Sequence, residues 1–323
     1  MSLWDLADLA TPWCVHVVAT LRIADHLEAG SLEIGPLAAA AGADADALDR
    51  VMRHLVEKGL FEQPAPGRFA LNDAARGLVG EQGRLGFDLE GIGGRMAHAW
   101  STLLAAVRTG RPGYSEIFGR GFWEDLESHP QVAASFDALM GPAGHGLPDP
   151  QVLPDPAEWE SIQTVVDVGG GTGTLLAEVL KFRPGLRGTL LDLPRTVARS
   201  NEVFASAGVA DRAKAVGQSF FDPLPAGADL YMLKSVLSDW PDAEAAAILR
   251  RCAEAARPAG RVVLVNGVSP DEPASPDLLM LVLVGGKNRS LPAFRALAAQ
   301  AGLEVSATAR LPNGRFVVEC RPV

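Results

Sequence analysis

The chain has 323 residues, 48% of them hydrophobic and 21% charged, which is typical of a globular protein with room for two domains. Its net charge of −10 disfavours nucleic acid as a partner, because sequence-independent binding needs clustered Lys and Arg to displace phosphate counterions. The chain opens without a basic secretion signal, and no apolar run approaches the ~18 residues of a membrane helix, so we expect a cytoplasmic protein with no membrane contact. The three cysteines have no metal-ligand spacing, so we expect no metal site.

Residues 1–85 show the pattern of a winged-helix domain. Apolar periodicity predicts helices over 13–27, 37–41 and 45–58. The string GLFEQPAPGRFALND then places large apolar residues on both sides of a Pro- and Gly-containing turn, which predicts a two-stranded wing.

The pattern over residues 86–150 predicts further helices and then a linker. Residues 141–156 carry five prolines and few apolar residues, which predicts a linker or lid between two compositionally different halves. The helices before it contain large apolar side chains that are more often core than site, namely Trp100, Phe118, Trp123, Phe136 and Met140.

Residues 151–323 repeat a strand, turn and helix pattern. The strings TVVDVGG, GTLLDL, ADLYMLKSV and GRVVLVNGV predict buried strands, and helices are expected over 174–181, 195–208 and 243–256. LEVSATARL and RFVVECRP predict a closing antiparallel pair. We therefore expect an α/β fold whose carboxy-terminal domain is Rossmann-like, with a doubly wound parallel sheet and an antiparallel edge.

A glycine-rich turn, DVGGGTG, stands between the first of these strands and its helix. Side-chain-free residues at Gly169, Gly171 and Gly173 would let a ligand lie against backbone N–H groups at a helix start. The second strand ends in Asp192, 25 positions after Asp167, where an acid can accept hydrogen bonds from both hydroxyls of a ribose. A merely tight loop would explain the glycines but not this acid, so the pattern predicts a nucleoside-type cofactor.

Four strings carry a resemblance to a known family: TVVDVGGGTG, RGTLLDLP, FFDPLPAGADLYMLKSVLSDWPD and ILRRCAEAARPAGRVVLV. They resemble the small-molecule O-methyltransferases of the plant caffeate and hydroxyindole type and their bacterial antibiotic-tailoring relatives, and the likeness covers nearly the whole chain. The resemblance implies S-adenosylmethionine or its product S-adenosylhomocysteine as cofactor. It also implies that residues 1–85 form a homodimer instead of binding DNA, and that 86–150 contribute to the substrate pocket.

The resemblance assigns roles to individual residues. Gly169, Gly171 and Gly173 would face the methionine end of the cofactor, Asp192 with Leu193 the ribose, Ser219 and Phe220 the adenine, and Lys234 its polar edge. Trp240 either walls the adenine pocket or simply packs at a helix start. The implied substrate pocket is apolar, which favours a flat, hydrophobic acceptor, although each residue could equally be ordinary core: Phe118, Trp123, Phe136, Met140, His145, Met280 and Val284.

The position of the family's catalytic histidine is occupied by Ser238, in LKSVLSDW. The two acids that brace this histidine in the resembling enzymes align with Asn266 and Asn288. Because methyl transfer to a hydroxyl requires loss of its proton, three neutral side chains here indicate that the site does not use that proton relay. All six histidines precede residue 151, so a histidine base could come only from the helical part, where His98 and His145 are the candidates unless each is merely a surface or packed imidazole. A compensating base of another type nearby is the alternative.

Three hypotheses follow. The first is an O-methyltransferase that methylates an already acidic hydroxyl of an aromatic secondary metabolite by proximity. The second keeps fold and cofactor but uses the bound sulfonium as a fixed charge for decarboxylation, hydroxylation or rearrangement. The third, a DNA-binding regulator, is disfavoured because residues 38–58 carry more acidic than basic side chains.

Overall fold

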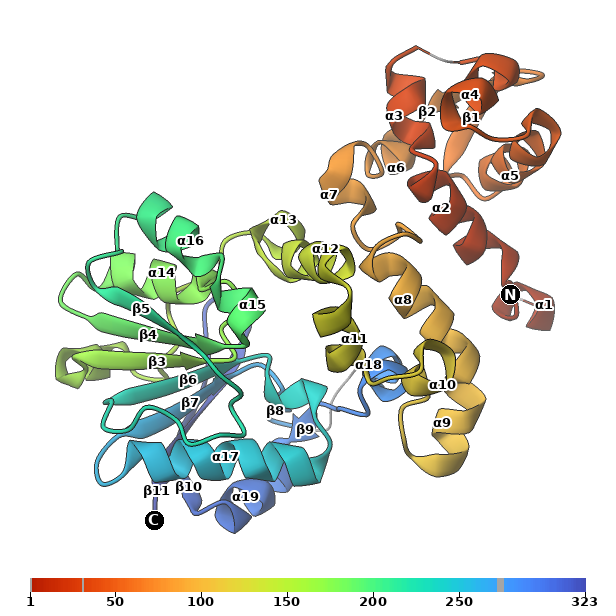
Figure 1. The fold of residues 1–323 in the computed structure, drawn as a ribbon. Coiled ribbons are helices and arrows are strands. Elements are labelled where there is room, and N and C mark those ends of the chain that lie inside the picture. Colours follow the sequence, from red (N-terminus) through yellow and green to blue (C-terminus); the bar gives the residue numbers. More distant parts are fainter. Residues whose placement is uncertain (1, 31, 272–275) are drawn as a thin grey trace. The chain divides into compact units, whose positions relative to one another are not determined.

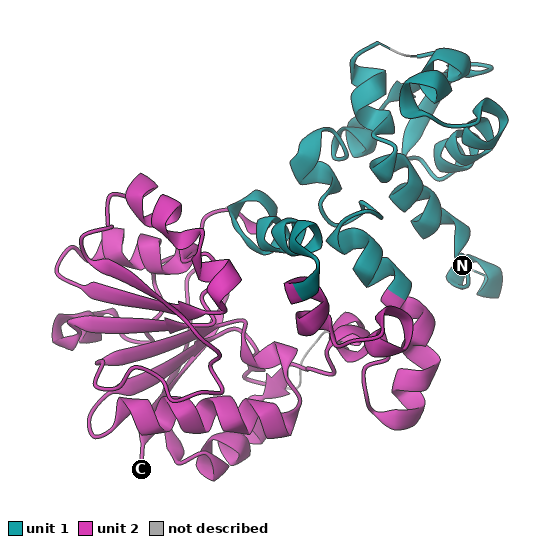
Figure 2. Cartoon of the chain, in the orientation of Figure 1, with its two compact units in different colours: residues 1–98, 128–144 teal, residues 99–127, 145–323 magenta. Residues whose placement is uncertain are grey.

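The computed structural model describes residues 2–30, 32–271 and 276–323 (Figure 1). The chain divides into two compact units, one formed by residues 1–98 and 128–144 and the other by residues 99–127 and 145–323 (Figure 2). The segment 86–150, which the sequence analysis treats as one part, contributes to both units. Among the described residues, no helix has the length and apolarity needed to cross a membrane.

The first unit is helical with one hairpin, as a winged-helix pattern predicts. The predicted helix over 13–27 is two helices, because Arg22 between them has φ 56°, which lies outside the helical region. Gly67, at φ 71°, makes the turn of the hairpin. The elements are α1 (Leu3–Leu6), α2 (Ala10–Thr20), α3 (Ile23–Glu28), α4 (Ile34–Ala41), α5 (Ala45–Glu57), β1 (Phe61–Ala65), β2 (Arg68–Leu71), α6 (Asp73–Arg76), α7 (Gly80–Arg84), α8 (Ile92–Ala99), α12 (Pro130–Met140) and α13 (Pro142–His145).

The second unit contains a seven-stranded sheet in the order β10-β11-β7-β6-β3-β4-β5. Strands β3 to β7 are parallel, and β11 is antiparallel to both β7 and β10, so the predicted Rossmann-like fold with an antiparallel edge is confirmed. The strands are β3 (Thr164–Val168), β4 (Arg187–Asp192), β5 (Ala213–Gly217), β6 (Leu230–Lys234), β7 (Arg261–Val265), β8 (Val268–Ser269), β9 (Arg289–Ser290), β10 (Leu303–Arg310) and β11 (Phe316–Pro322). The sequence analysis missed β5, an edge strand with little buried apolar surface.

Helices cover both faces of this sheet, which is why β3 and β7 are buried along nearly their whole length and are rich in valine (Figure 1). One core joins the sheet to α17 (Asp242–Ala256) and α19 (Leu291–Gln300), and the other joins it to α14 (Thr174–Phe182) and α16 (Ser200–Ser206). The remaining elements of the unit are η1 (Trp100–Thr102), α9 (Leu103–Thr109), α10 (Tyr114–Phe118), α11 (Phe122–Ser128), η2 (Pro156–Ser161), α15 (Pro194–Val197), η3 (Leu237–Asp239) and α18 (Leu278–Leu283).

The proline-rich segment 141–156 is only partly the linker that its composition predicts. Val152 and Leu153 are fully buried in the core on the α14 side of the sheet. These two adjacent residues are the part of the predicted linker that packs into the core.

The parallel strands position the residues singled out by sequence. The carboxyl ends of β3, β4, β6 and β7 meet at one edge of the sheet, where open α/β sheets bind their ligands. The glycine turn follows β3, Asp192 ends β4, Ser238 lies shortly after β6, and Asn266 directly follows β7.

Candidate active site

The glycine turn follows β3 directly. Gly169, Gly171 and Gly173 have φ values of 69°, 63° and 88°, in the left-handed region that favours glycine. A Cβ added to Gly169 would lie 2.9 Å from a Val236 methyl group, and one added to Gly173 would lie 2.8 Å from the Phe204 ring. A Cβ on Gly171 would meet no atom within 4 Å. The turn is therefore packed at both ends and open in its middle, where a ligand can approach backbone N–H groups at the start of α14.

Asp192 lies against this turn. Its Oδ2 accepts a hydrogen bond of 2.8 Å from the Gly171 N–H, and its Oδ1 accepts one of 2.7 Å from the Leu193 N–H. A carboxylate oxygen has more than one acceptor lone pair, so an oxygen bonded to a backbone N–H can also accept from a ribose hydroxyl. The structure thus brings together the glycine turn, Asp192 and Leu193 as the sequence predicts.

Asp167, in β3, is a buried acid beneath the turn. It is 1% exposed, and neither carboxylate oxygen has a hydrogen-bond partner in the described part of the chain. Burial, and then the charge of Asp192, raise its pKa to about 7, and the half-buried Lys234 ammonium opposes this shift. The sequence analysis used Asp167 only to measure a spacing, although an acid two positions before the first glycine was visible. Such an unsatisfied carboxylate fits a cationic group of a ligand.

The predicted adenine side is aromatic. The Phe220 ring lies 3.4 Å from the place where a Gly169 Cβ would be, and it meets Trp240 edge-on at 5.7 Å between centroids. Ser219 Oγ accepts a 3.2 Å hydrogen bond from the Phe221 N–H, so this side chain supports the local backbone. Trp240 also meets Phe221 edge-on and stacks on Trp123 at 6.1 Å. Its ring therefore packs between the adenine side and α11.

The three neutral positions have different partners. Asn266 Nδ2 donates to Ser235 Oγ at 3.1 Å, and Ser238 Oγ donates to the Ser235 carbonyl at 3.3 Å, so Ser238 and Asn266 meet at Ser235. Asn288 instead donates its backbone N–H and its amide to the two carboxylate oxygens of Asp277, both at 2.8 Å. Two of the three predicted residues therefore lie together, whereas the side chain of Asn288 is bonded to the residue that precedes α18.

Asp239 is the ionisable neighbour of Ser238 on η3. Its partial burial raises the pKa of the carboxyl to about 7, and a hydrogen bond with Ser238 opposes this shift. Asp239 was not predicted from the sequence to be a site residue. Its position next to Ser238 in the chain was the available indication of a further role.

The predicted substrate residues are distributed over both units. Phe118 and Trp123 belong to the second unit, where their rings lie 4.5 Å from Tyr114 and 5.0 Å from Phe122. His145, Met280 and Val284 belong to the same unit, whereas Phe136 and Met140 lie on α12 of the first. His98, the other histidine considered as a base, packs against Trp13 at 5.2 Å.

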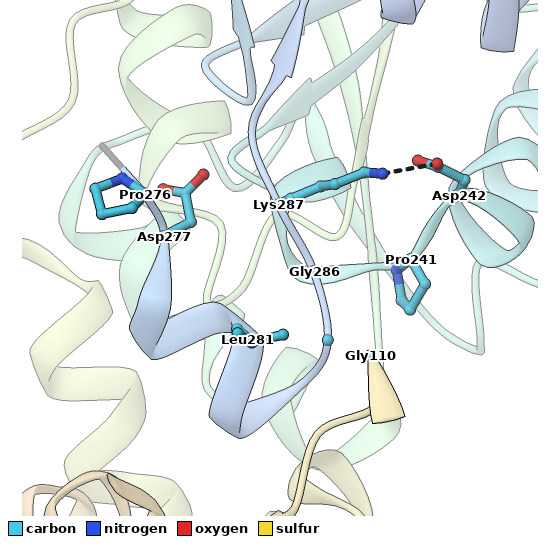
Figure 3. Close-up of a pocket in the computed structure, with 9 residues that line it drawn as sticks. Gly110, Pro241, Asp242, Pro276, Asp277, Leu281, Gly286 and Lys287 are labelled. Carbon is cyan, nitrogen blue, oxygen red and sulfur yellow. Dashed lines mark hydrogen bonds and ion pairs between the residues drawn. The ribbon is translucent and has the colours of Figure 1, made fainter. Parts of the chain in front are cut away.

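A pocket of about 340 Å³ lies at the start of α17 (Figure 3). The start of α17 and the start of α18 form two of its walls, and the Gly285–Lys287 segment runs between them. The Lys287 ammonium pairs with Asp242 at 2.8 Å across it. None of the residues predicted from sequence to contact a substrate lines this pocket, whose lining is Gly110, Pro241, Asp242, Pro276, Asp277, Leu281, Gly285, Gly286 and Lys287.

Comparison with known proteins places the whole chain in one family. Residues 100–304 match the O-methyltransferase domain model, and residues 4–81 match the O-methyltransferase dimerisation domain. The chain is 46% identical to the 2,7-dihydroxy-5-methyl-1-naphthoate 7-O-methyltransferase of Streptomyces carzinostaticus, over 95% of this chain and 93% of that protein. It is 38% identical to aclacinomycin 10-hydroxylase RdmB of Streptomyces purpurascens, over 94% of this chain and 83% of that protein.

The structural comparison agrees. The O-methyltransferase NcsB1 of neocarzinostatin biosynthesis, crystallised with S-adenosylmethionine and 2-hydroxy-5-methyl naphthoic acid, superimposes with a TM-score of 0.92 at 43% identity, covering 100% of this chain and 99% of that one. The glycine turn, the remaining acceptor capacity of Asp192 and the unsatisfied carboxylate of Asp167 fit this cofactor. The chain therefore belongs to the S-adenosylmethionine-dependent O-methyltransferases, a family that forms homodimers through an amino-terminal domain.

Proposed function

We propose that the protein methylates a hydroxyl of a flat, bicyclic aromatic acid of the naphthoate kind, and that it does so without a histidine base. The observation that carries the proposal is the neutral pair Ser238 and Asn266, joined at Ser235 and following the strands beside an intact cofactor site. Similarity to a naphthoate O-methyltransferase supports the acceptor class. The apolar character of the predicted substrate residues supports it as well.

The roles of the chain's own residues follow from their chemistry. When bound, the cofactor supplies an electrophilic methyl group on a sulfonium. Asp192 and the glycine turn hold the nucleoside, while Ser238 and Asn266 offer hydrogen bonds that orient the acceptor oxygen. Holding two reactants in line supplies much of the rate, as effective molarities of ~10⁵ M or more show for well-oriented groups. An acceptor whose hydroxyl is already acidic then needs no strong base.

A series of naphthols and naphthoates with graded hydroxyl pKa values tests this mechanism. We expect the inflection in kcat/KM against pH to move with the pKa of each acceptor, because the acceptor itself supplies the titrating group. Ser238→Ala should lower kcat by less than about tenfold, which is below the ~100-fold or more that a general base contributes. An inflection near pH 7 that stays fixed for every acceptor and disappears in Asp239→Asn would refute the proposal and assign proton transfer to that carboxylate.

A second candidate function is favoured by one observation, the 38% identity to a hydroxylase. In that case the cofactor would remain intact while the aromatic substrate changes. Measuring S-adenosylhomocysteine together with acceptor consumption separates the two functions. Our proposal predicts one S-adenosylhomocysteine for each acceptor consumed, and acceptor turnover without it would establish the alternative.

The buried Asp167 leads to a prediction about cofactor binding. We expect the cationic amino group of the cofactor to lower the pKa of this carboxyl from about 7, so that binding near neutral pH releases a proton. Titration with S-adenosylhomocysteine in buffers of different ionisation enthalpy at pH 7 should show release of about 0.5 proton. Asp167→Asn should abolish the release, and Asp239→Asn, which removes the other carboxyl with a pKa of about 7, should not. If wild type and Asp167→Asn release the same number of protons, Asp167 does not interact with the bound cofactor.

We also propose that the protein works in the cytoplasm. Cys14, Cys252 and Cys320 are all free thiols. Burial raises the pKa of both Cys252 and Cys320 to about 12, which keeps these two thiols unreactive. Three unpaired cysteines are typical of a reducing compartment.

A further inference from the structure

Arg289 is a buried cation next to the site that neither the sequence analysis nor the proposed mechanism uses. Its side chain is only 2% exposed. A buried arginine requires partners for its N–H donors, because an unpaired buried charge is very costly. Its partners therefore indicate which part of the structure this residue serves.

The guanidinium of Arg289 holds the turn that carries Ser238. One terminal nitrogen, Nη1, donates to the Leu237 carbonyl at 2.8 Å, and the other, Nη2, donates to the Trp240 carbonyl at 2.8 Å. These two carbonyls flank Ser238 and Asp239, so the planar guanidinium group spans the turn. Nε donates to Asp242 Oδ1 at 2.9 Å, at the start of α17, and Nη1 also donates to the Lys287 carbonyl at 3.3 Å.

The backbone of Arg289 is bound to the segment that carries Asn266. Its N–H donates to the Gly267 carbonyl at 3.0 Å, and β9 pairs with β8 directly after that residue. Asn288 precedes Arg289 in the chain. One residue thus connects the three segments that carry Ser238, Asn266 and Asn288.

We infer that Arg289 is the positioning residue of this active site: by bonding the Leu237 and Trp240 carbonyls, it sets the place of Ser238 and of the Trp240 ring relative to the acceptor and the cofactor. Trp240 stacks on Trp123 and meets Phe220, so a displaced Trp240 carbonyl would disturb both predicted binding sites. Lysine cannot bond both carbonyls in the same way as the guanidinium, because its three N–H donors share one nitrogen. The expected effect of Arg289 on kcat rests on the proposed methyl transfer, whereas its expected effect on the structure of the turn does not.

The test compares Arg289→Lys with a matched control, Arg212→Lys. Arg212 also donates to backbone carbonyls, those of Leu180 and Leu186 at 3.1 Å each, but it does so away from η3. We expect Arg289→Lys to accelerate amide hydrogen exchange over residues 237–242 at least tenfold. We expect it to lower kcat by about 100-fold, as a displacement near 1 Å can do, and to lower S-adenosylhomocysteine affinity by no more than about threefold, because Trp240 borders the adenine side but, among the described residues, Asp192 and the glycine turn form no hydrogen bond with Arg289. The control should change thermal stability but neither exchange over 237–242 nor kcat.

A second variant, Asp242→Asn, tests the same inference if Arg289→Lys does not fold. Asp242→Asn weakens one anchor of the guanidinium through a carboxylate that is 57% exposed, so it should fold and produce the same exchange pattern with a smaller loss of kcat. Unchanged exchange over 237–242 in both variants would overturn the inference. A loss of S-adenosylhomocysteine affinity equal to the loss of kcat would also overturn it. If wild type forms no S-adenosylhomocysteine with any acceptor, the proposed function fails, while the exchange and binding measurements still decide the role of Arg289.

Discussion

Asp192→Asn is expected to weaken S-adenosylhomocysteine binding by about 100-fold, because hydrogen bonds to a charged group contribute about 1.5–3 kcal/mol each and 1.4 kcal/mol is a factor of ten. The carboxylate already accepts from Gly171 and Leu193, one bond on each oxygen. An asparagine must turn its NH₂ group toward one of these N–H donors. The substitution therefore removes the charge that we propose binds the ribose, and it also weakens a hydrogen bond to the glycine turn.

Isothermal titration of the two proteins with S-adenosylhomocysteine measures this effect. The matched control is Asp211→Asn, which removes the same charge from an exposed position in the same unit. Thermal unfolding without ligand should show that Asp192→Asn remains folded. A loss of affinity smaller than about fivefold, which corresponds to less than one such hydrogen bond, would contradict the placement of the ribose at Asp192.

Gly286→Ala is expected to abolish most turnover without preventing cofactor binding. A Cβ at this position would lie 2.1 Å from the Ser238 carbonyl oxygen and 2.5 Å from the Asp239 carbonyl carbon. These are backbone atoms, which cannot turn aside as a flexible side chain would, so η3 must move. We expect kcat to fall by about 100-fold, since a misplacement near 1 Å costs that much in a positioned reaction.

Single-turnover rates and S-adenosylhomocysteine affinity, measured side by side, check this prediction. Gly185→Ala is the control, because a Cβ there meets nothing within 4 Å and its φ is not in the left-handed region. It should leave rate and affinity unchanged. Wild-type turnover in Gly286→Ala would mean that the place of Ser238 has no influence on the reaction.

Several predictions from sequence depended on local patterns alone. The parallel strands are mostly apolar because helices bury both of their faces, so β3, β4, β6 and β7 were predictable from composition. The glycine turn and Asp192 were predictable because each closes a strand and the carboxyl ends of parallel strands meet at one edge. The α2–α3 break was missed because it comes from the backbone conformation of one residue, Arg22, which has no distinctive sequence pattern.

The sequence by itself determined the family, the fold class and the cofactor, since these depend on the identity and order of residues, and it led to the hypothesis that Ser238 occupies the position of the family's histidine. Only the tertiary structure decided that Asn288 bonds to Asp277, that Asp167 has no hydrogen-bond partner in the described chain, and that Arg289 spans η3. The partner of a side chain depends on segments that are tens of residues away in the chain, and such contacts form only when the sheet brings those segments to the same edge.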